Sequence, residues 1–303
     1  MKIYTITLNP AYDIHADADN FAAGHECLAT VTSRDAGGKG VNISRALCAY
    51  NTPNTAVVVL GKENAGDFCS DIAYMDTLFF EREGRIRENL TLHSDNSPET
   101  RISFRGFAID DSILPEIAEK ITVDENTIIT FTGRVPDGMT VAASKIFLKD
   151  LQGRGARIVL DSKTFDFNDI LDVKPWLIKP NEEEIAEYLG APVRDLTDAA
   201  NKAKVFTEGG VENVMVSMGG DGAVLLTEGK TYIAKSPEVT VISTVGAGDS
   251  AIAGFITAAD KDPAQRLKTA VAFGSAACTT QGTQPPAKET VEKLLEIISV
   301  KIM

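Results

Sequence analysis

The sequence is short of the residues that build zinc sites and disulfide frameworks. Its 303 residues include four cysteines, scattered without a CxxC pair, and three widely spaced histidines. This usage predicts no zinc site and favours a reduced, cytoplasmic chain. The first ten residues lack a long apolar core, and no run approaches 18 apolar residues, so we expect neither a signal peptide nor a membrane-spanning helix.

Basic residues are also fewer than acidic ones. Lys and Arg number 30 against 43 Asp and Glu, which gives a formal net charge of −13. A field of this sign repels nucleic acids and anionic membranes, so we expect neither as a partner. An anionic substrate would need a local basic pocket.

Apolar runs that alternate between strand and helix character make up most of the chain. It is 44% hydrophobic, enough to bury a sizeable core. Strands are predicted at residues 2–8, 55–60, 127–131, 157–160, 176–178, 211–218, 223–227, 231–233 and 239–243. Helices are predicted at residues 40–50, 141–152, 181–189, 249–259, 263–279 and 289–300. This alternation predicts an α/β fold with a mostly parallel sheet and helices on both faces.

Two stretches depart from that pattern. Residues 12–33 and 88–109 are predicted to form short, irregular β segments rich in polar residues and turns. Each follows an α/β element and returns to one. We therefore expect them to form one small β lid on a single domain spanning residues 1–303; ordinary surface loops are the alternative.

The clearest chemical motif is STVGAGDS at residues 243–250, between a β-branched run and a helix. Gly246 and Gly248, with Ala247 between them, let the backbone approach a ligand closely, and the helix that follows offers unpaired N–H groups to an anion. Asp249 could accept a proton from an attacking hydroxyl. The motif predicts a site for a transferring phosphoryl group. A glycine turn with a capping aspartate is the simpler alternative, and the GxGxxA spacing also fits a nicotinamide dehydrogenase.

Three further strings open helices or turns with glycine or acidic residues. DAGGKGVN at residues 35–42 sets one lysine among three glycines, where backbone and ammonium can meet a phosphorylated ligand. KPNEEE at residues 179–184 opens a helix on which Asn181 and Glu184 share a face, so they could orient water around Mg²⁺; a capped helix with a solvated acidic turn is the alternative. SMGGDG at residues 217–222 predicts a nucleotide-binding turn or only a hairpin.

These strings, with TITLNPAYD near the start of the chain and WLIKPNEEE in its middle, occur in an order that resembles the ribokinase-like carbohydrate kinases of the PfkB family. Within the family the chain is most similar to bacterial 1-phosphofructokinases, with tagatose-6-phosphate kinases close behind. The resemblance implies a ribokinase-like three-layer sandwich with a mostly parallel central sheet and a small β lid. It also implies an enzyme that transfers the γ-phosphate of ATP to a ketohexose phosphate, most directly fructose 1-phosphate, giving fructose 1,6-bisphosphate.

Carried over motif by motif, the resemblance implies roles for individual residues. The transfer site would consist of Asp249 as catalytic base and of the anion hole formed by Gly246, Ala247 and Gly248. The sugar phosphate would be held by Asp13, Gly38, Lys39, Asn42 and Arg101. ATP would lie against Asn181, Glu184, Ser217, Gly219, Gly222 and Thr244, with Mg²⁺ held by Glu184 through water.

Three positions depart from the family pattern, one of them Lys163, which could face the nucleotide or be an ordinary surface lysine. Ser243 stands where many relatives carry an aspartate tied to monovalent-cation binding, which leaves K⁺ activation open. Arg134 replaces a small polar residue near the sugar site, so we expect it to add a phosphate contact or to shift substrate preference.

Other functions stay open at this point. The chain could phosphorylate tagatose 6-phosphate or fructose 6-phosphate, or it could be a catalytically inactive regulator that binds a sugar phosphate or a nucleotide. Because exposed β edges tend to be covered, the lids of two copies could also pair in a homodimer.

Overall fold

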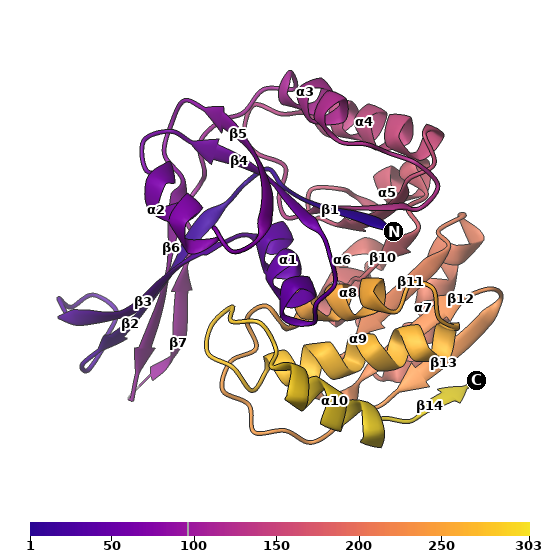
Figure 1. Cartoon of the computed structure of the whole chain (residues 1–303). Helices are drawn as coiled ribbons and strands as arrows, with labels where there is room; N and C mark the ends of the chain where they lie inside the picture. Colours follow the sequence, from indigo (N-terminus) through magenta and orange to yellow (C-terminus); the bar gives the residue numbers. More distant parts are fainter. Residues whose placement is uncertain (96) are drawn as a thin grey trace.

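A long central sheet organises the protein (Figure 1). The computed structural model describes residues 1–95 and 97–303, and in them this sheet has ten strands. From one edge to the other they are β14 (Val300–Ile302), β13 (Lys230–Ala234), β12 (Ala223–Thr227), β11 (Asn213–Ser217), β10 (Leu177–Ile178), β9 (Arg157–Asp161), β8 (Thr127–Thr132), β1 (Lys2–Thr7), β4 (Thr55–Gly61) and β5 (Asp76–Arg82). Neighbours from β11 to β5 pair in parallel, whereas β11 to β14 pair antiparallel. The predicted α/β fold with a mostly parallel sheet is confirmed.

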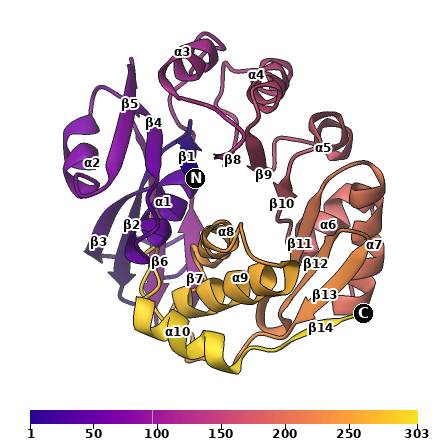
Figure 2. The ribbon, with the colours of Figure 1, turned by 45° about the vertical axis from the view of Figure 1, so that its right-hand side comes forward.

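Helices cover both faces of this sheet (Figure 2). One face carries α1 (Lys39–Ala49), α8 (Ala247–Thr257), α9 (Pro263–Ala277) and α10 (Lys288–Ile297). The other face carries α3 (Ile113–Lys120), α4 (Val141–Gly153), α5 (Phe167–Val173), α6 (Glu182–Leu189) and α7 (Leu196–Glu208). The arrangement is the three-layer sandwich that the resemblance implied.

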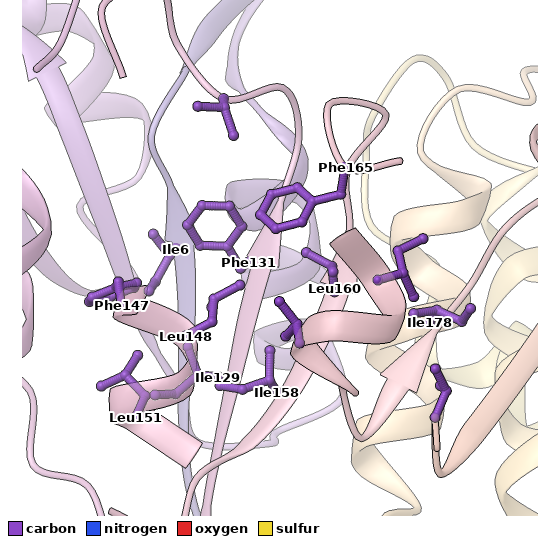
Figure 3. Packing of buried hydrophobic residues seen from close by; sticks show 14 of the residues in the cluster. Ile6, Ile129, Phe131, Phe147, Leu148, Leu151, Ile158, Leu160, Phe165 and Ile178 are labelled. Carbon is purple, nitrogen blue, oxygen red and sulfur yellow. The ribbon is translucent and has the colours of Figure 1, made fainter. Parts of the chain in front are cut away.

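The strands are apolar on both faces because both faces are buried. Side chains alternate along a strand, so Ile128 packs towards α8 and α9 while Ile129 packs towards α3 and α4. Figure 3 shows the second of these clusters, in which Phe131 and Phe165 meet edge to face with ring centroids 5.9 Å apart. Interlocked cores on both faces hold the carboxyl ends of the strands in fixed positions.

A second, four-stranded sheet projects from the main body (Figure 1). Its order is β3 (Ala29–Gly37), β2 (Ala11–Ala18), β6 (Arg87–Ser94) and β7 (Ser97–Ile102). At its base the ring of Tyr12 packs edge to face on Phe68 of α2 (Ala65–Asp71), with centroids 5.5 Å apart. The guanidinium of Arg34 lies 3.5 Å from the centre of the same ring. We call this sheet the lid sheet.

Some predicted elements were wrong or missing. The strand predicted at residues 239–243 is absent: the segment is irregular, and Val241 and Ile242 are 59% and 58% exposed. β13 pairs with β12 on one side and with β14 on the other, so residues 239–243 find no open strand edge there. The patterns also missed β5, β14, α2, α3, α5 and α7. No helix within residues 1–95 and 97–303 combines the length and apolar character needed to cross a membrane.

Candidate active site

A cavity of about 510 Å³ opens where the carboxyl ends of β1, β8 and β9 face the lid sheet. Ligands of open parallel sheets bind at this edge, and the volume suits small ligands. The expected site residues that line it are Asp13, Gly38, Lys39, Asn42, Arg101, Arg134, Asn181, Glu184, Thr244, Gly246, Gly248 and Asp249. Residues from four separate motifs, together with Arg101 and Arg134, therefore share one cavity.

The N-terminus of α8 forms one wall. Gly246 precedes the helix in the left-handed region, at φ 79°, which turns the chain into α8. None of the described side chains caps this terminus. The Ala247 N–H donates to the Thr244 carbonyl at 3.3 Å, so the N–H groups of Gly248 and Asp249 are the ones left to meet an anion. A Cβ at Gly248 would lie 3.0 Å from Nζ of Lys179, so glycine leaves room for that ammonium. This wall can receive a negatively charged group.

Asp249 lies in that first turn and is 7% exposed. Its Oδ2 accepts a hydrogen bond of 2.9 Å from Nδ2 of Asn42 on α1. Burial raises the pKa of Asp249 to about 6, while Lys39, Asn42 and Lys179 act in the opposite direction. A carboxylate with this pKa is ionised at neutral pH and can still accept a proton.

Lys39 lies against Asp161 at the end of β9. Its Nζ is 2.8 Å from Oδ2 of Asp161, whose side chain is 6% exposed. Burial alone would raise the pKa of Asp161, but Lys179 and Lys39 hold it below its usual value. Asp161 therefore stays ionised. Lys179 lies in the KPNEEE string, but the sequence motifs assigned no role to either Asp161 or Lys179.

The lid sheet supplies the opposite end of the cavity. Oδ1 of Asp13 accepts hydrogen bonds from Nδ2 of Asn89, at 3.0 Å, and from Nη2 of Arg101, at 3.3 Å. Asp13 and Asn89 are partners in the parallel register of β2 and β6. Both side chains are thus fixed across neighbouring strands.

Three guanidinium groups meet at this end. Arg87, Arg101 and Arg134 all line the cavity. Burial lowers the pKa of Arg87, and its two arginine neighbours lower it further, against the effect of Asp13. The buried Nε of Arg87 has no hydrogen-bond partner among the described residues. The Nη1 and Nη2 groups of Arg87 donate to the carbonyls of Phe104, at 3.2 Å, and Asn9, at 3.5 Å, which fixes the guanidinium among like charges that an anion would relieve. Arg87 and Asn89 were missed, although alternate polar residues on β6 were a signal that could have found them.

Asn181 and Glu184 fix each other at the start of α6. Oδ1 of Asn181 accepts from the Glu184 backbone at 2.8 Å, and Oε2 of Glu184 accepts from the Asn181 backbone at 3.0 Å. The capped helix start is therefore real, and both residues also line the cavity. In the described part of the chain, no cluster of three His, Cys, Asp or Glu side chains could hold a metal ion. A metal at Glu184 would need ligands from a bound nucleotide or water.

Four expected residues do not line the cavity. Ala247 is one, and the others are Ser217, Gly219 and Gly222. Ser217 lies beside the start of α6, where its backbone N–H donates to the Pro180 carbonyl at 3.1 Å, and Gly219 and Gly222 lie in the turn that follows β11. These three residues therefore lie near the cavity wall that carries Asn181 but do not line the cavity itself.

This chain matches known proteins over nearly its whole length. The profile of the pfkB family carbohydrate kinases matches residues 6–290. A protein named 1-phosphofructokinase from Vibrio cholerae is 29% identical over 311 residues, which cover 100% of this chain and 97% of that protein. One of the same name from Escherichia coli strain K12 is 30% identical over 284 residues, 89% of each chain. Phosphofructokinase-2 from Escherichia coli, solved with substrates and products, superposes with a TM-score of 0.90 at 23% identity, over 98% of this chain and 99% of that one.

Proposed function

Because the chain belongs to the pfkB family of carbohydrate kinases, which use ATP, we propose that it phosphorylates a ketohexose phosphate, namely fructose 1-phosphate, to fructose 1,6-bisphosphate. One observation carries this proposal. A single cavity has a buried carboxylate and a helix N-terminus at one end and three arginines at the other. That layout suits a substrate with a reactive hydroxyl at one end and a phosphate at the other.

In the proposed reaction Asp249 is the catalytic base. It accepts the proton of the sugar hydroxyl while the hydroxyl oxygen bonds to the γ-phosphorus, and the bond to ADP breaks. The Asn42 amide donates to one carboxylate oxygen and leaves the other for the hydroxyl. The first turn of α8, at Gly246 to Gly248, receives the negative charge of the moving phosphoryl group, with the Lys179 ammonium beside it.

The lid end holds the sugar phosphate. The proposed place of its phosphate group is surrounded by Arg87, Arg101 and Arg134. The Asp13 carboxylate would accept hydrogen bonds from sugar hydroxyls, and the Asn89 amide would donate to them. A chain of net charge −13 can receive an anion here, because basic side chains outnumber acidic ones in the cavity lining. Arg134 would then be a phosphate contact in addition to those of the lid.

The nucleotide would occupy the wall formed by Asn181, Glu184 and Thr244, with its far end towards Ser217, Gly219 and Gly222. Mg²⁺ bound with ATP would neutralise charge on the phosphates. Glu184 fits this role through water, because it is buried at the cavity and its two oxygens are differently engaged: Oε2 accepts from the Asn181 backbone, whereas Oε1 lies 3.7 Å from Nζ of Lys163, beyond hydrogen-bond distance. K⁺ activation stays a prediction: the Ser243 hydroxyl accepts from the Val245 backbone at 3.2 Å, and rates with and without KCl would test it.

The lid sheet is the proposed site of a homodimer. Its edge strand β3 is exposed along much of its length, with Val31 and the preceding Leu28 facing solvent. Pairing with a second lid would cover that edge. Light scattering on the purified protein tests it, and a monomer at all concentrations would contradict it.

The function is tested by ADP release over a panel of acceptors. Fructose 1-phosphate, fructose 6-phosphate, tagatose 6-phosphate and the free sugars are compared by kcat/KM. We expect the highest value for fructose 1-phosphate. A higher value for either 6-phosphate would overturn the substrate assignment, and no turnover on any acceptor would favour a regulator. Binding of NAD but not ATP would favour a dehydrogenase.

A further inference from the structure

Lys163 lines the cavity but has no task in the proposed reaction. It is one of six basic residues in the cavity lining. The three arginines lie at the proposed sugar-phosphate end, and Lys179 lies beside the helix wall. Lys39 is bound to Asp161 at 2.8 Å. Among the described residues the Lys163 ammonium pairs with Glu184 alone, whose Oε1 lies 3.7 Å from Nζ, beyond hydrogen-bond distance. This ammonium is therefore available to a ligand.

We propose that Lys163 is a nucleotide-binding residue whose ammonium contacts the phosphate chain of ATP from the side of Glu184. The inference rests on the proposed function, through the place it gives the nucleotide, but not on which sugar phosphate accepts the group. Because Lys163 departs from the family pattern, the contact would be a property of this sequence.

The turn that carries Lys163 is held from both sides. The Ser162 carbonyl accepts a hydrogen bond from the Phe165 backbone at 3.3 Å, and the Thr164 hydroxyl accepts one from the Val135 backbone at 3.1 Å. Phe165 is fully buried in the core that Figure 3 shows. The backbone is thus fixed beside the cavity, while the Lys163 side chain, 53% exposed, is free to turn towards a ligand.

Negative charge gathers where the nucleotide is proposed to bind. The side chains of Glu184 and Asp161 are only 9% and 6% exposed, and the phosphate chain of ATP would add several negative charges beside them. Burial would raise the pKa of Asp161, but three lysines, Lys163 among them, hold it below its usual value. The Lys163 ammonium therefore already acts on this wall. It has three donors, so it can donate to a phosphate oxygen while it stays close to Glu184.

Glu184 links Lys163 to the metal that ATP carries. Its Oε2 accepts from the Asn181 backbone, whereas Oε1 faces Lys163 and is also the oxygen left for a magnesium-bound water. An ammonium and a metal would thus neutralise the same charges. Binding of ATP without Mg²⁺ should therefore depend on Lys163 more strongly than binding of ATP with Mg²⁺.

The simpler explanation is a surface lysine that only neutralises Glu184 at the start of α6. The two explanations differ in how the loss of the ammonium depends on the ligand. A lysine that contacts the phosphate chain matters for ATP, less for ADP, and not for adenosine. A lysine that acts only on Glu184 gives no such dependence on the number of phosphates.

The experiment compares Lys163→Met and Lys163→Arg with Lys2→Met as matched control. Lys2 is also a half-exposed lysine paired with one carboxylate, that of Asp124, but it does not line the cavity. Calorimetry measures the Kd of ATP, ADP and adenosine, with Mg²⁺ and with EDTA. Urea unfolding shows that each variant is folded, as expected for a change at an exposed side chain.

For Lys163→Met we expect the Kd of ATP to rise roughly 3–10-fold with Mg²⁺, the magnitude of one charged hydrogen bond at a half-exposed site, and about 10–30-fold in EDTA. The Kd of adenosine should not change. Lys163→Arg should restore most of the affinity, because it keeps the charge. In turnover, Lys163→Met should raise KM for ATP by the same 3–10-fold factor and leave KM for the sugar phosphate within about twofold. Lys2→Met should match wild type throughout.

Three results would overturn the inference. The first is a Kd of ATP that stays the same in Lys163→Met, with Mg²⁺ and in EDTA. The second is an equal loss of affinity for adenosine and ATP. The third is a raised KM for the sugar phosphate with unchanged ATP binding, which would place Lys163 at the acceptor end. If wild type binds no ATP, the proposed function fails and the inference with it. If another sugar phosphate is the better acceptor, only the substrate assignment fails.

Discussion

Replacing Asp249 with asparagine should stabilise the protein while it abolishes activity. Burial raises the pKa of Asp249 from 3.8 to about 6 in the folded chain. The folded state therefore holds this proton more tightly than the unfolded state, and stability falls as pH rises through the window from 3.8 to 6. At 1.36 kcal/mol per unit of pKa, the ionised carboxylate costs the fold up to about 3 kcal/mol above that window.

Asparagine removes this cost because it stays neutral. Its Oδ1 can still accept the hydrogen bond from Asn42. At pH 7.5 we therefore expect Asp249→Asn to be more stable than wild type by ~2–3 kcal/mol, and at pH 4.5 by only about 1 kcal/mol, since Asp249 is then mostly protonated in the fold. Turnover should fall by about 10²–10⁴-fold, the typical contribution of a general base. ATP affinity should change little.

Urea unfolding at the two pH values measures the first effect, and ADP release with saturating sugar phosphate measures the second. Asp260→Asn, at an exposed position beyond the far end of α8, is the control and should change neither. The reasoning is refuted if the variant is less stable than wild type at pH 7.5, or if its turnover stays within tenfold of wild type. If activity is lost but stability shows no pH-dependent gain, burial does not raise the pKa of Asp249 in the folded protein.

Three further outcomes are expected. Arg87→Leu should raise KM for the sugar phosphate roughly 10–100-fold through loss of a charged hydrogen bond, and leave KM for ATP within about twofold; a larger change for ATP would place Arg87 elsewhere. The wild-type kcat/KM should fall about tenfold per pH unit below about pH 6, as Asp249 takes up its proton, and a flat profile down to pH 5 would contradict this. Gly254→Ala should destabilise by roughly 1–3 kcal/mol in urea, although alanine normally favours a helix, because its Cβ would lie 2.6 Å from the Thr269 carbonyl of α9.

The sequence specified the parts of the site that depend on neighbouring residues. Gly246 adopts a left-handed conformation, which glycine allows at no steric cost, and it delivers Asp249 into the first turn of α8, where the motif placed it. Asn181 and Glu184 cap each other three residues apart, as their spacing allows. In each case the chemistry lies within one turn of chain, so local pattern is enough.

Local sequence patterns could not predict contacts between segments that are far apart in the chain. Arg87 and Asn89 reach Asp13 only through the register of β6 on β2, more than 70 residues away in sequence. The same limit explains the strand wrongly predicted at residues 239–243. β-branched residues favour a strand, but pairing requires a free neighbour, and β13 is already paired with β14. Lys39 belongs to this group too, because Asp161 on β9 decides where its ammonium lies.

The division of the cavity between two sheets has a consequence for how the proposed reaction is controlled. Asp249 and the helix wall belong to the main body, whereas Arg87 and Arg101 belong to the lid sheet. Arg134, which follows β8 of the main body, lies with the two lid arginines. A phosphate bound among all three would tie the lid to the main body and replace repulsion between like charges with attraction. The sugar phosphate would thereby hold the lid over the cavity and exclude water from the ATP end, so its own phosphate group favours transfer over hydrolysis.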